Sequence, residues 1–200
     1  MNNLVNKEKV LYFFTSSFPL GFSETFIENE IQFLSKKFNK VHIISNDLTS
    51  IVIRDIPSNV TLKRIRYELT TFEKLMSLFF VFNHFFWNEL LHVKLKYNKK
   101  ISLGIVKTAL SSLFNAKRLS REFINLKILN SNSIYYSYWS NDNALALALL
   151  KKNKNIKCIS RIHGWDVFFG PSKYNYLPYR NLISKNINAI YSISQAGINY

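Results

Sequence analysis

Two short segments of the chain carry residue types that can do chemistry. Residues 18–27 include a proline, a glycine and a glutamate, and residues 161–166 include an arginine, a histidine and an aspartate. Each segment follows a run expected to form a buried strand, residues 10–14 and residues 156–162. Ligands of open α/β sheets bind beyond the carboxyl ends of the strands. We therefore expect both segments at one edge of a parallel sheet, next to a phosphate-bearing ligand.

The first segment is a candidate phosphate loop. Gly21 can adopt backbone angles closed to other residues and lets a ligand approach the main chain. A helix starting near Thr25 would present free N–H groups suited to a diphosphate, and Phe22, Ser23 and Glu24 complete the loop. An ordinary strand-to-helix turn is the alternative. The chain has five glycines and neither a G-x-G-x-x-G motif nor a P-loop, which argues against a dinucleotide dehydrogenase and a nucleoside triphosphatase.

The second segment centres on His163. A histidine at a strand's carboxyl end can donate a hydrogen bond to a sugar hydroxyl or to a leaving phosphate oxygen. Gly164 permits close approach, and Asp166 can orient the imidazole or bind a hydroxyl itself. The alternative is a structural histidine with a satisfied partner. No histidine pair has metal-ligand spacing backed by carboxylates, so we expect no metal.

Composition limits the class of protein. Two hundred residues, 48% hydrophobic and 16% aromatic, suffice for one sizeable folded domain. The single cysteine, Cys158, excludes a disulfide framework and fits a reducing cytosol. The polar first residues lead directly into a strand, so we expect no signal peptide and a cytoplasmic location.

The charge is strongly basic, at +15. Such a charge fits nucleic acid, an anionic membrane or phosphorylated substrates, and an A/T-rich coding bias explains it equally. The excess is concentrated in residues 94–127, with nine basic residues against Glu122, and in residues 151–185, with eight against Asp166. We expect no nucleic-acid partner, because no recognisable binding motif accompanies this charge.

The order of elements predicts an α/β protein with a Rossmann-like parallel sheet flanked by helices. Thr25 and Glu28 fit a capping box at the start of the first helix. Ser194 fits the N-cap of a last helix close to Tyr200, so we expect the sequence to be cut short there. Strands are predicted at residues 10–14, 41–45, 60–65, 133–139, 156–162 and 189–193, and further helices at residues 72–96, 102–129, 143–152 and 175–185.

An aromatic stretch at residues 75–88 contains no Lys, Arg, Asp or Glu. It is shorter than the roughly 20 residues that span a bilayer. Its aromatic residues occupy nearly all faces of the expected helix, and basic residues follow from Lys94. This stretch is expected either to pack in the core or to contact an anionic membrane surface.

Taken together, these segments resemble the N-terminal domain of family-4 glycosyltransferases of the GT-B fold. The likeness covers essentially the whole chain, residues 1–200, and residues 51–130 are its least distinctive part. The matching residues are Phe18-Pro19, Ser23 to Ile27, Asn29 to Ile31, Tyr138-Trp139, Arg161, His163, Gly164, Asp166, Tyr176, Pro178, Arg180 and the run from Ala189 to Tyr200.

The resemblance implies transfer of a sugar from a nucleotide-sugar donor to a glycan or lipid-linked acceptor, with retention and without a metal or other cofactor. It implies that His163 contacts the donor sugar and assists transfer, and that the Gly21 loop lies near the diphosphate. The donor-binding domain would follow Tyr200, so we expect this chain alone to be inactive. The implied setting is bacterial surface polysaccharide synthesis at the inner face of the membrane. The substrate-binding candidates are Gly21, Phe22, Ser23, Glu24, Trp139, Arg161, Gly164, Trp165, Arg180 and Ser194, and the catalytic ones are His163 and Asp166.

A second hypothesis belongs to another class of protein. The chain would be a non-catalytic carbohydrate- or nucleotide-binding remnant, or one subunit of a split glycosyltransferase. A reading frame that continues into a second α/β domain favours the enzyme, and a true stop codon favours the remnant or subunit.

Overall fold

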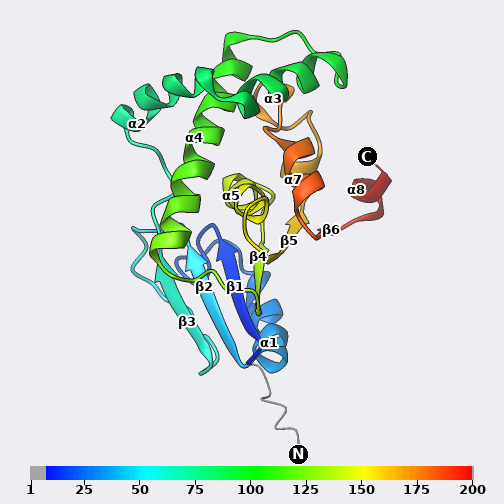
Figure 1. Cartoon of the computed structure of the whole chain (residues 1–200). Coiled ribbons are helices and arrows are strands. Elements are labelled where there is room, and N and C mark those ends of the chain that lie inside the picture. The colour runs from blue at the N-terminus through cyan, green and yellow to red at the C-terminus, as the bar shows by residue number, and fades with distance from the viewer. Residues whose placement is uncertain (1–7, 200) are drawn as a thin grey trace, which may run out of the picture.

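The computed structural model describes residues 8–199, and these form one parallel sheet with helices on both faces (Figure 1). The six strands of this region run in the order β3-β2-β1-β4-β5-β6, and every pairing is parallel. The predicted α/β Rossmann-like class is confirmed. The strands are β1 (Val10–Thr15), β2 (Lys40–Ser45), β3 (Val60–Arg64), β4 (Ser133–Ser137), β5 (Lys157–Ile162) and β6 (Ala189–Ser192).

The central strand β1 is apolar throughout because both of its faces are covered. Phe13 is in register with Ile43 on one side and Tyr136 on the other, and all three belong to the core under α1 (Ile27–Lys37). The neighbouring Phe14 points to the opposite face, where its ring lies 4.7 Å from that of Phe123 in α4 (Leu103–Asn125). Alternation along one strand therefore supplies two separate cores.

The helix α5 (Asp142–Lys151) is the innermost helix of the larger core. Its residues from Asn143 to Leu150 are all buried. A helix that is apolar all round has no face suited to water, and α5 contacts α4, β4, β5 and α7 (Arg180–Asn186). Cys158 faces this core, where burial raises the pKa of its thiol to about 12. The thiol is therefore not a nucleophile in the folded protein.

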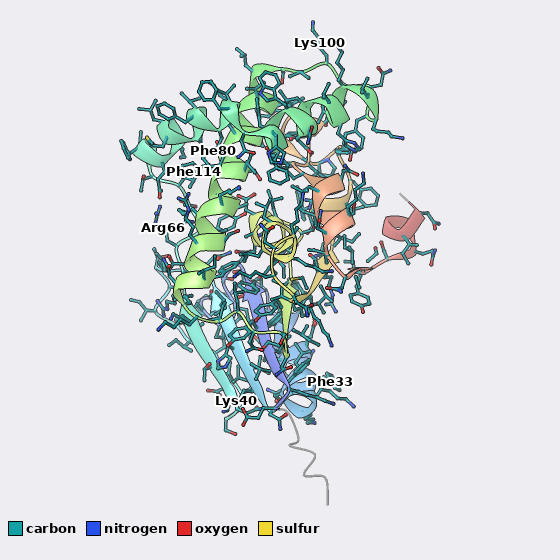
Figure 2. The ribbon with its side chains drawn as sticks, in the orientation of Figure 1. Phe33, Lys40, Arg66, Phe80, Lys100 and Phe114 are labelled. Atoms are coloured by element: carbon teal, nitrogen blue, oxygen red, sulfur yellow. The ribbon has the colours of Figure 1, made fainter. Side chains whose placement is uncertain are left out.

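The predicted helix at residues 72–96 is wrong as a single element. The structure has α2 (Thr71–Met76), a 3₁₀ helix η1 (Ser77–Phe82) and α3 (His84–Leu95). Asn83 separates the last two: its backbone is extended, and its side chain accepts a hydrogen bond from the Phe85 N–H. These three elements run along one end of the molecule, and Phe80 of η1 packs edge-on against Phe114 of α4 (Figure 2). No helix in residues 8–199 is long and apolar enough to cross a membrane.

Two predicted helix starts are also wrong. The Thr25 capping box is absent: Phe26 occupies the N-cap of α1 and makes no side-chain cap bond, because residues 24–28 form tight turns first. The helix predicted from residue 175 begins at Arg180. The preceding segment is held irregular by the buried Glu89 carboxylate, which accepts hydrogen bonds from the Tyr176 hydroxyl and the Tyr179 N–H at 2.9 and 2.8 Å.

The remaining predicted elements are confirmed with shifts of a few residues at their ends. Ser194 caps α8 (Gln195–Asn199), since its hydroxyl accepts a hydrogen bond from the Gly197 N–H at 3.2 Å. Two short pieces were not predicted, α6 (Gly164–Val167) and the 3₁₀ helix η2 (Lys173–Asn175).

Candidate functional site

The loops after β1, β4 and β5 meet at the carboxyl edge of the sheet. β4 lies between β1 and β5, and all three run parallel. Trp139, just after β4, connects the two outer loops. Its indole N–H donates a hydrogen bond of 2.5 Å to Glu24, and its ring centroid lies 4.3 Å from that of His163. The segments around Gly21 and His163 therefore occupy one edge, as the sequence predicted.

Glu24 is the anchor of the loop after β1. Its carboxylate accepts hydrogen bonds from three successive backbone N–H groups, those of Ser16 at 3.1 Å and of Ser17 and Phe18 at 2.7 Å. Successive N–H groups in a turn form a concavity that binds anions. Here the protein's own carboxylate fills that concavity, so these donors are already engaged. Glu24 itself is buried and has a left-handed backbone with φ 56°.

Gly21 is explained by the local packing of its loop. Its φ is 60°, which favours glycine, and its N–H donates to the Val52 carbonyl at 2.9 Å. A Cβ at this position would lie 3.0 Å from the Ser50 hydroxyl. The glycine thus lets the segment at residues 50–53 pack against the loop, and no ligand is required to account for it.

The neighbours of Gly21 differ in their surroundings. Phe22 is 81% exposed and projects into solvent. Ser23 is tied to the loop: its hydroxyl lies 2.5 Å from the Ser17 hydroxyl, and its carbonyl accepts a hydrogen bond from Arg54 at 2.5 Å.

His163 is nearly buried, with 8% of its surface exposed, and its ring lies in an aromatic cluster. The ring centroids of Trp139, Tyr138 and Phe26 lie 4.3, 4.9 and 6.4 Å from that of His163. Within residues 8–199 neither imidazole nitrogen makes a hydrogen bond of ordinary geometry, although the ring faces the Asp166 N–H in a capping-box arrangement at the start of α6. Buried polar atoms are nearly always paired in folded proteins, so an unpaired imidazole at this edge is suited to bind a ligand.

Burial also determines the charge of this imidazole. Desolvation lowers the pKa of His163, and the nearby Asp166 only partly opposes this shift. The ring is therefore neutral near pH 7, with one nitrogen able to donate a hydrogen bond and the other able to accept one.

Asp166 holds the backbone of two loops together. One carboxylate oxygen accepts a hydrogen bond from the His163 N–H, and the other accepts one from the Ser140 N–H at 2.7 Å. The carboxylate is thus engaged with backbone. It positions the loops that carry His163 and Trp139, and in this arrangement it acts on the imidazole through the main chain.

Arg161 and Arg180 are both engaged within the protein. Arg161 forms an ion pair of 2.5 Å with Glu30 of α1 and also donates to the Tyr138 hydroxyl at 3.2 Å. Arg180 donates to the carbonyl and hydroxyl oxygens of Ser140, the same residue that Asp166 binds. Arg180 and Asp166 therefore both hold Ser140 in place.

The remaining predicted residues lie around this centre. Gly164 begins α6, and an added Cβ there would meet only the Phe168 ring, at 4.0 Å, so a larger residue would fit. Trp165, two residues after His163, is 71% exposed. Ser194 follows β6, one strand further along the edge, where it serves as a helix cap.

Three residues of the site were missed by sequence reasoning as site members: Phe26, Tyr138 and Ser140. Tyr138 lies near the end of the predicted strand at residues 133–139 and Ser140 directly follows that strand, which was the available signal. Phe26 stacks on Tyr138 with ring centroids 5.5 Å apart. The described residues contain no group of three His, Cys, Asp or Glu side chains arranged to hold a metal ion.

Comparisons with known proteins agree with the fold. No model of a known protein family matches the chain, and no curated protein matches it. A solved trehalose-6-phosphate structure from E. coli bound with UDP-2-fluoro glucose aligns with 95% of this chain at a TM-score of 0.54 and 12% identity. A trehalose-6-phosphate synthase, studied with bisubstrate glycomimetics for glycosyl transfer with retention, aligns with 94% at a TM-score of 0.53 and 12% identity.

These neighbours are GT-B glycosyltransferases, and the likeness shows that the chain has the fold of part of such an enzyme. At 12% identity it shows the fold alone. The chain spans about two fifths of the length of these neighbours, 41% and 40%.

Proposed function

We propose that this chain is the N-terminal, acceptor-side half of a GT-B glycosyltransferase of the family-4 type. The enzyme would transfer a sugar from a nucleotide-sugar to a glycan or lipid-linked acceptor, with retention and without a metal. The observation that carries the proposal is the unpaired, nearly buried imidazole of His163 at the carboxyl edge of this fold. One structural neighbour with this fold is bound with a UDP-sugar.

His163 is the proposed contact to the donor sugar. A neutral imidazole donates a hydrogen bond to a sugar hydroxyl without bringing a positive charge against the reacting centre. The rings of Trp139 and Phe26 flank the imidazole and provide apolar walls of the kind that sugar rings pack against. Asp166 and Glu24 fix the loops that hold this arrangement.

The leaving diphosphate needs a source of positive charge, because the His163 imidazole is neutral. Charge that develops as the sugar–phosphate bond breaks must be stabilised by preorganised donors. Arg161 and Arg180 are committed to Glu30 and Ser140, and Glu24 occupies the N–H groups after β1. We therefore propose that the diphosphate is held by a donor-binding domain outside residues 1–200, and that this chain alone does not complete the reaction.

The second hypothesis remains a non-catalytic binding remnant or a subunit of a split enzyme. One observation favours this hypothesis. The backbone N–H groups after β1 already donate to the Glu24 carboxylate, so they are not free to bind a diphosphate. A protein of this kind would bind a sugar or nucleotide and transfer nothing.

We further propose a cytoplasmic location, peripheral on the inner face of the cell membrane, in bacterial surface polysaccharide synthesis. The support comes from α2, η1 and α3, where Phe86 and Leu90 are core residues while other apolar side chains face solvent. The acidic residues of these three elements are Glu73, which is paired with Arg66, and the buried Glu89, so this face is basic as well as apolar. The apolar side chains of this face that point to solvent are Phe72, Leu75, Leu78, Phe79, Phe82, Trp87, Leu91 and Leu95.

A sugar-transfer assay on the intact gene product, with UDP-, GDP- and ADP-sugars as donors, tests the enzymatic proposal. Product formation from one of these donors supports it. Binding of a nucleotide-sugar without turnover would instead favour the remnant.

A further inference from the structure

A cavity of about 630 Å³ lies on the α4 side of the sheet. Its size falls within the range of small-molecule sites, roughly 300 to 1,000 Å³. Its walls come from the first half of α4, from α2 and residues 67–69, and from the segment that includes η2, and the start of α5 contributes Asp142.

Three lysines from three separate elements line this cavity. Lys74 belongs to α2, Lys107 to α4 and Lys173 to η2. Within residues 8–199 none of them forms an ion pair. Two carboxylates line the same cavity, Glu68 and Asp142, so the three lysines are in excess by one and make the potential there positive, which attracts an anion. A lysine ammonium is a common binder of phosphate.

The cavity also offers groups that recognise hydroxyls. Thr108 and Ser111 line it from α4, the first next to Lys107 and the second about one helical turn beyond it. Asp142 lines it too, and its carboxylate is held in place by the Ser112 hydroxyl and by the Asn115 amide at 2.9 Å. A fixed carboxylate oxygen with remaining lone pairs can accept a hydrogen bond from a ligand hydroxyl.

One wall of the cavity is η2, residues 173–175, which we call the strap and which has an unusual backbone. Tyr174 and Asn175 are consecutive non-glycine residues with left-handed φ values of 62° and 48°. The Tyr174 ring packs directly on the backbone of Gly104, where an added Cβ would lie 2.6 Å from the ring. The Lys99 ammonium donates to the Asn175 carbonyl and holds the strap from its other side. Backbone strain of this kind persists where surrounding contacts fix it, and it clusters at ligand sites.

We propose that this cavity binds a phosphorylated sugar or polyol, with Lys74, Lys107 and Lys173 on the phosphate and Asp142 on a hydroxyl. The inference rests on the proposed function, in which the cavity holds the phosphate-bearing acceptor. The cavity and the imidazole flank the same loop: Asp142 lies two residues after Ser140, which Asp166 joins to His163. An acceptor held there is next to the loop of Ser140, which Asp166 joins to the loop that carries His163, the proposed donor contact.

Calorimetric titration of the 200-residue chain with mannose, inorganic phosphate and mannose 6-phosphate tests the site. We expect mannose 6-phosphate to bind more tightly than either component. The double variant K107E/K173E should weaken that binding at least about tenfold, because each reversal replaces attraction by repulsion at the phosphate. The matched control Lys154→Glu reverses an exposed lysine outside the cavity and should change the affinity less than about twofold.

The phosphate can belong to a free sugar or to a lipid headgroup, and a second probe separates these sources. Vesicles containing phosphatidylglycerol present the phosphorylated polyol on a lipid. Binding to these vesicles alone, lost in K107E/K173E and kept in Lys154→Glu, assigns the cavity to a lipid-linked ligand. Binding of neither probe overturns the proposal, and so does binding that survives the double reversal in a variant with an unchanged unfolding midpoint and with Phe79 and Phe82 also replaced by Ser.

Failure of the cavity proposal can be distinguished from failure of the glycosyltransferase proposal. His163→Ala should leave mannose 6-phosphate binding unchanged, since His163 does not line the cavity. If mannose 6-phosphate binding depends on Lys107 and Lys173 but no donor sugar is transferred, the cavity is a binding site and the proposed function is wrong. If transfer by the intact gene product is unaffected by K107E/K173E, the cavity is not the acceptor site.

Discussion

The indole nitrogen of Trp139 lies 2.5 Å from Oε1 of Glu24, and this hydrogen bond joins loops that are 115 residues apart in sequence. The same indole ring packs against His163. Trp139 therefore connects a carboxylate that organises the loop after β1 to an imidazole that follows β5. The geometry of the candidate site depends on this one side chain being held from both sides.

Replacing Glu24 by Gln should destabilise the protein by about 2 kcal/mol. The amide has one acceptor oxygen where the carboxylate has two, and its NH₂ group would face backbone donors. Urea unfolding of the purified chain measures the loss. Glu28→Gln is the matched control on the same segment: it removes only the partly exposed pair with Arg54 and should cost less than about 1 kcal/mol. Equal losses in the two variants would contradict the anchoring role of Glu24.

Replacing Asp166 by Asn should also cost about 2 kcal/mol, because the carboxylate accepts backbone N–H bonds from His163 and Ser140. The variant should move the His163 and Trp139 resonances in NMR spectra as the two loops separate. Ser140→Ala keeps the backbone N–H and should leave those resonances near their original positions. An Asp166→Asn variant with unchanged stability and unchanged spectra would show that Asp166 does not position these loops.

The imidazole of His163 should titrate below the ordinary value of about 6.5. Burial lowers its pKa in the folded state, so the proton binds the unfolded chain more tightly. This group then contributes a loss of stability as the pH falls below about 6.5, and the loss levels off below the folded-state pKa. His42 and His92 are shifted in the same direction, so the comparison is with His163→Gln, which removes only the His163 part. An NMR titration midpoint at or above about 6.5 would show that the ring is not desolvated.

The apolar face on η1 should bind anionic vesicles. Phe79 and Phe82 are 63% and 87% exposed, and their replacement by Ser should weaken vesicle binding about tenfold by removing apolar area. Phe33→Ser is the matched control: Phe33 is 69% exposed on α1, at the other end of the molecule from Lys100 (Figure 2). Binding should also fall with salt, since the basic residues contribute through screened attraction. Vesicle binding that is equal in both variants, or absent at low salt, removes this face as a membrane contact.

The strands were predictable because their signal is local. Residues 10–14 are a continuous apolar run, and residues 41–45 are apolar except for His42 and Ser45; such runs are buried on both faces of a parallel sheet. Parallel strands also place their loops at one edge, so the meeting of the Glu24, Trp139 and His163 loops followed from the element order.

The helix boundaries and the roles of the polar side chains were not predictable in this way. An aromatic run has no periodic feature that marks the break at Asn83. No local pattern shows that the Glu24 carboxylate accepts hydrogen bonds from the loop after β1, or that the predicted cap at Thr25 does not form. The sequence made Arg161 and Arg180 candidates for substrate binding. Their partners, Glu30 and Ser140, are distant in sequence and are brought to them only by tertiary packing.

Turnover of the His163→Ala variant of the intact gene product tests the central claim most directly, with an accepted nucleotide-sugar as donor. The proposal predicts a fall in kcat of at least about a hundredfold, the usual scale for loss of a positioned catalytic group, with the unfolding midpoint little changed. Turnover equal to that of the unaltered protein would show that this imidazole takes no part in sugar transfer.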